Sequence, residues 1–145
     1  MSNIDEEISA VREEVRFLRD INDIKLLPIL YCHYILKFDV EALFSQYTPD
    51  GTFQNVGIGT PGFYEGESLR AMIGNGLEEY NPWPFTHNHY IDIIDKSHAT
   101  GMVHAEFRQG KEAYRVTHIG RYEDEYQKLD GAWKFKSRKL TATIL

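Results

Sequence analysis

The hydrophobic pattern of the sequence changes its period once along the chain, and this change restricts the folds that the chain can adopt. Through residue 79, apolar residues recur mostly every three or four positions, which is the spacing of one face of an α-helix. From residue 87 onward, apolar and polar residues alternate in runs separated by short polar turns, as in half-buried β-strands. Helices followed by an antiparallel meander of strands predict a fold of the α+β class.

The helical period predicts four helices, over residues 4–18, 22–37, 39–47 and 67–79. The first has acidic residues in its opening turn, where the helix dipole favours them, and its apolar stripe suits packing on a partner chain. Pro28 should kink the second helix or mark its true start. Asp39 is the expected N-cap of the third helix, and Thr-Pro-Asp-Gly at residues 48–51 should form the turn that follows it.

The alternating pattern predicts four strands, over residues 87–94, 98–108, 113–126 and 132–143. Glycine and proline divide residues 57–66 into short strands and loops. No internal repeat, low-complexity tract or linker marks a boundary in the sequence. We therefore expect one domain over residues 1–145.

Composition narrows the choice of partners and of cellular location. Hydrophobic residues make up 42% of the 145 positions, and the formal net charge of -6 leaves no basic patch for nucleic acid or an anionic membrane. A single cysteine, Cys32, excludes an internal disulfide, and the N-terminus lacks the pattern of a signal peptide, so the cytoplasm is the expected location. The most apolar run, at residues 26–36, is too short to span a bilayer.

Four segments, in this order, carry a family likeness: residues 24–44 with Asp-Val-Glu-Ala-Leu at 39–43, Thr-Pro-Asp-Gly-Thr-Phe at 48–53, residues 87–101 ending in Ala-Thr-Gly, and Gly-Arg-Tyr-Glu-Asp-Glu-Tyr at 120–126 followed by Asp-Gly-Ala-Trp at 130–133. Their order and spacing resemble the SnoaL-like family of the nuclear transport factor 2-like superfamily. Relatives in that family include scytalone dehydratase, hexachlorocyclohexane dehydrochlorinase and a bile-acid dehydratase. The likeness covers nearly the whole chain.

The resemblance implies a cone-shaped fold, in which a curved antiparallel sheet wraps against the helices and leaves a pocket at its wide end. It also implies a homodimer or homotrimer, and chemistry that needs no cofactor. Family members that dehydrate or dehydrohalogenate use a histidine on the first long strand as a base, and the spacing to Ala99 assigns that position to His87. The aspartate that partners this histidine in the family is matched by Leu36, so the family's dyad is absent.

Histidines and acids occur at positions that could face the pocket. His87 and His89 are two positions apart on a predicted strand and should project to one face, with His87 as the candidate base and His89 as a candidate substrate contact. On the next strand, His104 and Glu106 could supply a substitute acid–base pair if that face is concave. A His-x-His strand also suits a metal ion, but a third ligand at suitable spacing is not evident.

Tyrosines and loop aromatics complete the expected pocket. Tyr31 and Tyr34, three positions apart on a helix, could direct their hydroxyls into one cavity and donate a hydrogen bond to an oxygen on which charge develops. Trp83 and Phe85 come from a proline-flanked segment that could form the lip of the pocket. The remaining expected substrate contacts are Leu36, Phe53, Met102, His118 and Tyr122. Each of these side chains could instead be ordinary core packing.

Two functions fit these features. One is a dehydratase-like lyase or isomerase that uses histidine acid–base chemistry on a cyclic or aromatic metabolite. The other is a non-catalytic module that binds a ligand or assembles into oligomers, which Leu36 at the family's aspartate position favours. An enzyme should keep an open cavity with converging polar groups, whereas an assembly module should fill that space with Leu36, Phe53 and Met102.

Overall fold

The computed structural model describes residues 2–109 and 115–145, whose elements follow one another as expected of the α+β class. The helices are α1 (Asn3–Leu36), α2 (Val40–Ser45) and α3 (Gly66–Tyr80), and the strands are β1 (Tyr47–Val56), β2 (Gly62–Glu65), β3 (Pro82–Ile93), β4 (His98–Gln109), β5 (Val116–Leu129) and β6 (Ala132–Ile144). The strand predicted over 113–126 begins at two positions outside the described residues, and its remainder belongs to β5.

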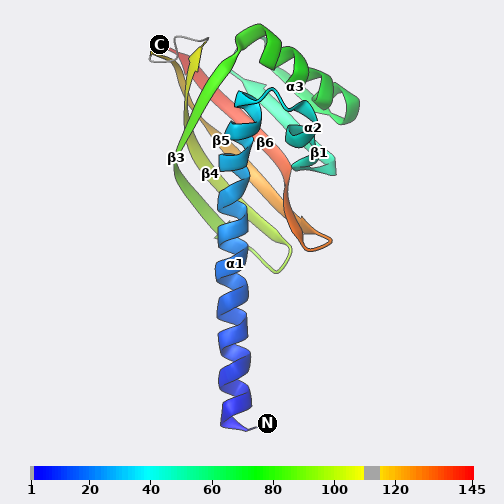
Figure 1. Cartoon of the computed structure of the whole chain (residues 1–145), viewed down its shortest axis with the longest axis vertical. Helices are drawn as coiled ribbons and strands as arrows, with labels where there is room; N and C mark the ends of the chain where they lie inside the picture. Colours follow the sequence, from blue (N-terminus) through cyan, green and yellow to red (C-terminus); the bar gives the residue numbers. More distant parts are fainter. Residues whose placement is uncertain (1, 110–114) are drawn as a thin grey trace.

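The strands form one curved, unclosed sheet in the order β2-β1-β6-β5-β4-β3 (Figure 1). Neighbours pair antiparallel except β1 and β6, which are parallel and join the β1–β2 hairpin to the last strand of the meander. The concave face packs against α1, and α2 and α3 lie at the wide end of the sheet. The predicted α+β cone is therefore confirmed. The parallel pair was not predicted, because alternation within a strand carries no information about which strand lies beside it.

The two helices predicted at the N-terminus are one continuous helix, α1, which runs through Pro28. Pro28 is buried, and the helix around it packs on β3, so the burial of this face compensates for the hydrogen bond that proline cannot donate. At its start, Ser2 and Asp5 form a reciprocal capping box. Figure 1 shows the N-terminal half of α1 projecting far beyond the sheet.

Asp39 caps α2 as predicted, since its carboxylate accepts a hydrogen bond from the amide of Ala42 at 3.1 Å. The turn predicted at residues 48–51 is wrong, because those residues belong to β1. The pairing of β1 with β6 shifts register between Tyr47 and Thr52. Residues typical of turns therefore mark an irregularity inside a strand, where the chain bends without reversing.

A bulge in β3 separates two histidines that were expected on one face. His87 pairs with His104, but the next pair joins Tyr90 to Met102, and Asn88 between them has a positive φ of 54°. Two residues of β3 thus oppose one residue of β4, which reverses the alternation after His87. His87 projects from the outer face of the sheet, whereas His89 projects inward, so the expectation of a shared face is wrong.

Within the part of the chain that the structure describes, no helix is both long enough and apolar enough to cross a membrane.

Candidate functional site

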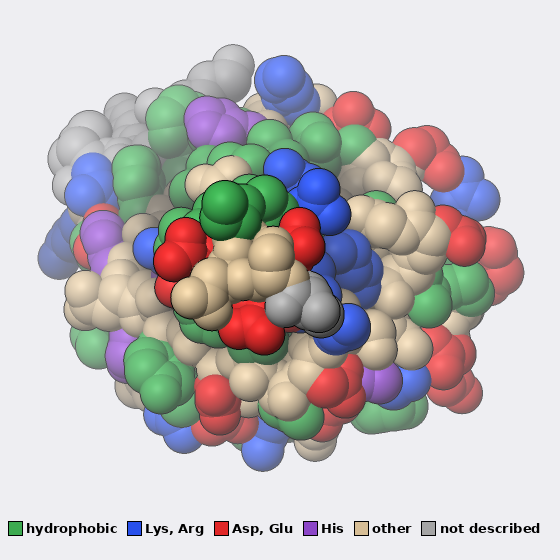
Figure 2. Space-filling view, turned by 90° about the horizontal axis from the view of Figure 1, so that it is seen from below, with side chains coloured by type: hydrophobic (Ala, Val, Ile, Leu, Met, Phe, Trp, Pro, Cys, Tyr) green, Lys and Arg blue, Asp and Glu red, His purple; other side chains and the backbone are tan. Residues whose placement is uncertain are grey.

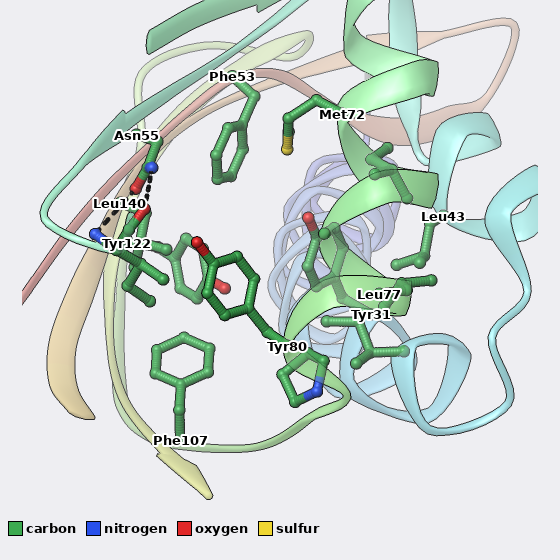
Figure 3. Close-up of a pocket in the computed structure, with 15 residues that line it drawn as sticks. Tyr31, Leu43, Phe53, Asn55, Met72, Leu77, Tyr80, Phe107, Tyr122 and Leu140 are labelled. Carbon is green, nitrogen blue, oxygen red and sulfur yellow. Dashed lines mark hydrogen bonds between the residues drawn. The ribbon is translucent and has the colours of Figure 1, made fainter. Parts of the chain in front are cut away.

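A cavity of about 140 Å³ opens at the wide end of the cone, between the concave face of the sheet and α3 (Figure 3). Its lining is mainly apolar and comprises Tyr31, Ile35, Leu43, Phe53, Asn55, Ile58, Met72, Ile73, Gly76, Leu77, Tyr80, Pro82, Phe107, Tyr122 and Leu140. Figure 3 shows the rings of Phe53, Tyr80 and Phe107 directed toward the centre of this space. Phe53 therefore lines the cavity without filling it, and the interior stays open.

Tyrosine hydroxyls are the main polar groups in this lining. The hydroxyls of Tyr31 and Tyr47 lie 3.3 Å apart, within hydrogen-bond distance of each other. Burial raises the pKa of Tyr31, and it raises the pKa of Tyr122 well above the ordinary value for tyrosine, because a buried phenolate would lose its hydration. Both side chains consequently stay protonated and can donate hydrogen bonds to a ligand oxygen.

Asn55 fixes the rim of the cavity. Its side-chain nitrogen donates to the carbonyl oxygens of Ile58 and Thr60, the latter at 3.1 Å, and its side-chain oxygen accepts from the amide of Ile58 at 3.3 Å (Figure 3). Both amide hydrogens are therefore committed to the loop that follows β1. Asn55 shapes the entrance and has little hydrogen-bonding capacity left for a ligand.

A buried ion pair lies beneath the tyrosines. Arg138 Nε donates to Asp124 Oδ1 at 2.8 Å and Arg138 Nη2 donates to Oδ2 at 3.1 Å, while the Tyr126 hydroxyl donates to Oδ2 at 3.0 Å. The guanidinium also packs over the ring of Tyr31, with its carbon 4.6 Å from the ring centroid. This network fixes the rings that form the floor of the cavity.

His89 belongs to the same buried network and not to the cavity lining. Its Nε2 lies 2.9 Å from the Tyr126 hydroxyl oxygen. The hydrogen of that hydroxyl is given to Asp124, so His89 Nε2 must carry the hydrogen that joins the two residues. Burial, with smaller effects from the charges of Arg138 and Lys25, lowers the pKa of His89 to about 4. His89 is therefore a neutral, hydrogen-bonded interior residue at pH 7.

His118 lies beside the entrance. It lines a smaller cavity that shares Ile58, Tyr80, Pro82 and Phe107 with the main one. The Thr117 hydroxyl donates to the carbonyl of Phe107 at 3.2 Å and lies 2.9 Å from His118 Nδ1. A hydrogen on Nδ1 would complete this contact and would leave the lone pair on Nε2.

The expected acid–base group on β3 and β4 lies on the outer face of the sheet. His87 Nε2 is 3.7 Å from Glu106 Oε2, and the side chain of His87 is 53% exposed. These two residues and His104 line a shallow outer groove, separate from the interior cavity. The pleat of β4 explains why His104 and Glu106 do not face the pocket. Both alternate with the buried Val103 and Ala105 and therefore point outward.

Other predicted contacts also lie outside the cavity. Trp83 and Phe85 are on the outer face of β3, where the Arg108 guanidinium packs over the Phe85 ring at 4.8 Å. Met102 lies on the outer face of β4, because it alternates with the buried residues of that strand. Tyr34 packs against the core but does not line the main cavity, whereas Tyr31 and Tyr122 both do.

The comparisons with known proteins agree with this architecture. A family model described as a SnoaL-like domain matches residues 16–139. The chain belongs to the SnoaL-like family. No protein of curated function matches it.

Three solved structures with the same fold are distant from this chain in sequence. Rv3472 from Mycobacterium tuberculosis, a protein of unknown function, is 24% identical, with a TM-score of 0.76 over 98% of this chain and 76% of its own. A protein of unknown function with a cystatin-like fold from Nostoc punctiforme is 21% identical, with a TM-score of 0.75 over 85% and 90% of the two chains. The LinA-type3 hexachlorocyclohexane dehydrochlorinase from Novosphingobium barchaimii is 19% identical, with a TM-score of 0.76 over 91% and 94%.

In this SnoaL-like chain, Leu36 neither replaces an aspartate inside the cavity nor fills the cavity. It is the last residue of α1 and is 42% exposed, whereas its neighbour Ile35 is buried and lines the cavity. Leu36 therefore lies outside the main cavity, where it was expected to contact a substrate. Helical rotation of about 100° per residue places these neighbours on different sides of α1.

Twelve lining residues of this SnoaL-like pocket were not predicted from the sequence, namely Ile35, Leu43, Asn55, Ile58, Met72, Ile73, Gly76, Leu77, Tyr80, Pro82, Phe107 and Leu140. One signal was available, because a glycine inside a helix often has a packing or functional reason. A side chain at Gly76 would meet nothing within 4 Å, which marks the open space beside it. The other residues follow ordinary periodic patterns, so only the fold reveals that they face an empty space.

Metal and thiol chemistry find little support in these side chains. Among residues 2–109 and 115–145, no three histidine, cysteine or acidic side chains come together as a possible metal site. Cys32 is partly buried, and burial raises the pKa of its thiol, so the reactive thiolate is disfavoured.

Proposed function

We propose that this chain binds a small molecule with an apolar ring in the main cavity and holds a ring oxygen through tyrosine hydroxyls. The observation that carries the proposal is an open, largely apolar cavity in which the buried Tyr31 and Tyr122 remain protonated donors. An apolar cavity of about 150 Å³ is known to admit benzene. A volume of about 140 Å³ therefore suits one six-membered ring.

A polar groove next to the cavity suggests that the ligand carries a polar arm. The groove shares Asn55, Ile58, Met72, Gly76 and Tyr80 with the cavity and adds polar residues. Those additions include Ser68, Asn75 and Glu79, with no lysine or arginine among the described lining. A neutral or cationic arm suits this groove better than an anionic one.

Binding of matched single-ring probes tests the proposal. 4-Methylphenol carries a hydroxyl where 1,4-dimethylbenzene carries a methyl group of similar size, so their dissociation constants report whether a tyrosine donates to the ligand. We expect 4-methylphenol to bind about fivefold more tightly, because one net hydrogen bond contributes about 1 kcal/mol. Tyr122→Phe should reduce this difference, and Gly76→Leu should abolish binding of both probes by filling the cavity. Absence of binding by either probe, or binding that Gly76→Leu leaves unchanged, contradicts the proposal.

A second candidate function is a lyase or isomerase reaction in the same cavity, with His118 and not His87 as the base. The supporting observation is that His118 lines a smaller cavity that shares four lining residues with the main one. In such a reaction Nε2 would take the proton of a C–H bond next to a carbonyl. The electron pair of that bond would move onto the carbonyl oxygen, where Tyr31 or Tyr122 would donate a hydrogen bond.

Deuterium exchange separates catalysis from simple binding. Cyclohexanone incubated with the protein in D₂O would gain deuterium next to its carbonyl faster than in buffer, as measured by mass spectrometry. His118→Gln should remove the acceleration, whereas His87→Gln, on the outer face, should leave it unchanged. Exchange no faster than in buffer leaves the binding proposal standing and overturns catalysis on ketones of this kind. Loss of exchange in His87→Gln alone would support the base that the family likeness assigns.

A further inference from the structure

The N-terminal half of α1 carries an apolar stripe that is open to solvent. The stripe consists of Ile4, Ile8, Val11, Val15 and Leu18, with exposed fractions between 46% and 66%. Intervals of four, three, four and three residues between them follow the heptad pattern of a helix that pairs with another helix. Isolated apolar residues on a surface are normal, but five in one row on a projecting helix form a continuous docking face.

The stripe cannot be covered by the rest of the same chain, that is, by the sheet with α2, α3 and the C-terminal half of α1, which together are called the body. The buried face of α1 includes Ile24, Leu27 and Tyr31, and the 100° rotation per residue places this face on the opposite side of the helix from the stripe. Since α1 is one continuous helix from Asn3 to Leu36, the N-terminal half does not fold back onto the sheet. A surface that covers the stripe would therefore come from another molecule.

We infer that a second copy of this chain covers the stripe, with the two N-terminal helices antiparallel around a two-fold axis near Val11. In this pairing Ile4 lies beside Leu18 of the second copy, and Ile8 lies beside its Val15. A heptad stripe is self-complementary in this way, because the same surface on both copies forms the interface. The pairing is independent of the pocket and of the proposed function.

The position of the body decides between antiparallel and parallel pairing. Figure 2, which looks along α1 from its N-terminal end, shows the body extending beyond the helix on every side. Two helices side by side and parallel would bring two bodies into the same space. Antiparallel helices place the bodies at opposite ends of the pair, with the two wide ends and their cavities facing away from each other.

The charges along the helix do not distinguish the two arrangements. Residues 5–7 are acidic, but Glu13 and Glu14 lie beside Arg16 and Arg19 near the body, and Glu13 pairs with Arg16 in the same helix. Parallel pairing would offer attractive contacts such as Glu7 with Arg12 of the second copy. Exposed ion pairs contribute little, and they cannot offset overlap between two folded bodies.

Sedimentation of the full chain over a range of concentrations tests the pairing. We expect a concentration-dependent species of twice the 16.9 kDa chain mass. Val11→Glu should raise its dissociation constant by at least about tenfold, because it buries a charge at the centre of the interface. Ser9→Glu adds the same charge to the opposite side of the helix and should leave the dissociation constant unchanged. Circular dichroism should show both variants folded, since neither position contacts the body. A monomer at every concentration, or a dimer that Val11→Glu does not weaken, overturns the inference.

Disulfide cross-linking tests the orientation. In a Cys32→Ser background, Ile4→Cys mixed with Leu18→Cys should form a mixed disulfide on oxidation. Ile4→Cys alone should stay uncross-linked, because antiparallel helices keep its two copies about 20 Å apart at 1.5 Å of rise per residue. Efficient cross-linking of Ile4→Cys with itself shows parallel helices and overturns the antiparallel arrangement.

Discussion

The guanidinium carbon of Arg138 lies 3.7 Å from the centroid of the Tyr122 ring, so the buried cation contacts a wall of the pocket directly. The side chains of Arg138 and Asp124 are both fully buried. Burial raises the pKa of Asp124, and the attraction of Arg138 opposes that effect. Stability of the core and shape of the pocket are therefore coupled through one charged pair.

Replacing Arg138 with methionine should destabilise the protein strongly. The change leaves the Asp124 carboxylate buried without its cation, and breaking a buried pair in this way costs about 3–5 kcal/mol. Urea unfolding monitored by tryptophan fluorescence measures the loss. The double variant Arg138→Met with Asp124→Leu removes both charges and should recover part of the stability. A double variant that is less stable than Arg138→Met would contradict this explanation.

His89 should make the stability depend on pH between about 4 and the ordinary histidine value near 6.5. In this range the unfolded chain binds a proton at His89 that the folded chain does not, so the free energy of unfolding falls as the pH is lowered. The full difference would correspond to about 3 kcal/mol, and solvent screening of a partly exposed ring reduces it to about 1–2 kcal/mol.

The pH effect is measured by urea unfolding at several pH values between 4 and 7. His89→Gln keeps a hydrogen-bond donor for Tyr126 but removes the titration, so its stability should depend less on pH. His98→Gln changes an exposed histidine at the start of β4 and serves as the control. Equal pH dependence in the wild type and in His89→Gln would assign the effect to carboxylates elsewhere.

The sequence predicted the architecture well because that architecture follows from local periodicity. The change from helical to alternating spacing identified the α+β class, and Asp39 identified the start of α2. The face of a residue on a strand was harder to predict. One bulge at Asn88 reversed the alternation and moved His87 outward, and no pattern in the adjacent sequence announces such an insertion.

Pocket residues could be predicted from the sequence only where a residue expected to be buried was also one expected to contact a ligand. Tyr31, Phe53 and Tyr122 lie on apolar faces and were expected in the pocket, which they line. Leu36 was expected in the pocket because the family likeness aligns it with a pocket aspartate. An alignment does not show which side of α1 faces the cavity at the end of the helix. Tyr80 was not predicted, since its place depends on how α3 packs against strand β1.

Gly120 should be required for the close approach of β5 to β6. A Cβ at this position would overlap the carbonyl oxygen of Thr141 and lie 2.8 Å from Ala142 Cα, and neither backbone group can move without disturbing the sheet. Gly120→Ala should therefore destabilise the protein by about 1–3 kcal/mol, as measured by urea unfolding. Gly74→Ala provides a matched control, since its Cβ would meet only Val40 at 3.9 Å. That change should stabilise α3 by about 0.5–1 kcal/mol. Similar effects of the two substitutions would show that local crowding at Gly120 is not the cause.

Asp20 should anchor α1 at the point where the helix leaves the body. Its side chain is buried, and Oδ1 accepts hydrogen bonds from Trp133 Nε1 at 2.8 Å and from Lys128 Nζ at 3.0 Å, which joins α1 to the β5–β6 hairpin. Asp20→Asn keeps an acceptor oxygen for Trp133 but loses the charge, so we expect a loss of about 1 kcal/mol.

Asp20→Ala removes both hydrogen bonds and leaves the Trp133 donor buried without its acceptor, which should cost about 2–3 kcal/mol. Hydrogen exchange measured by mass spectrometry should show faster exchange in this variant in the part of α1 around Asp20. The reason is that the helix loses its fixed contact with the β5–β6 hairpin. The explanation fails if α1 in Asp20→Ala exchanges hydrogen at the wild-type rate and the variant loses less unfolding free energy than Asp20→Asn. Apolar contacts such as those of Ile24 would then hold the helix without Asp20.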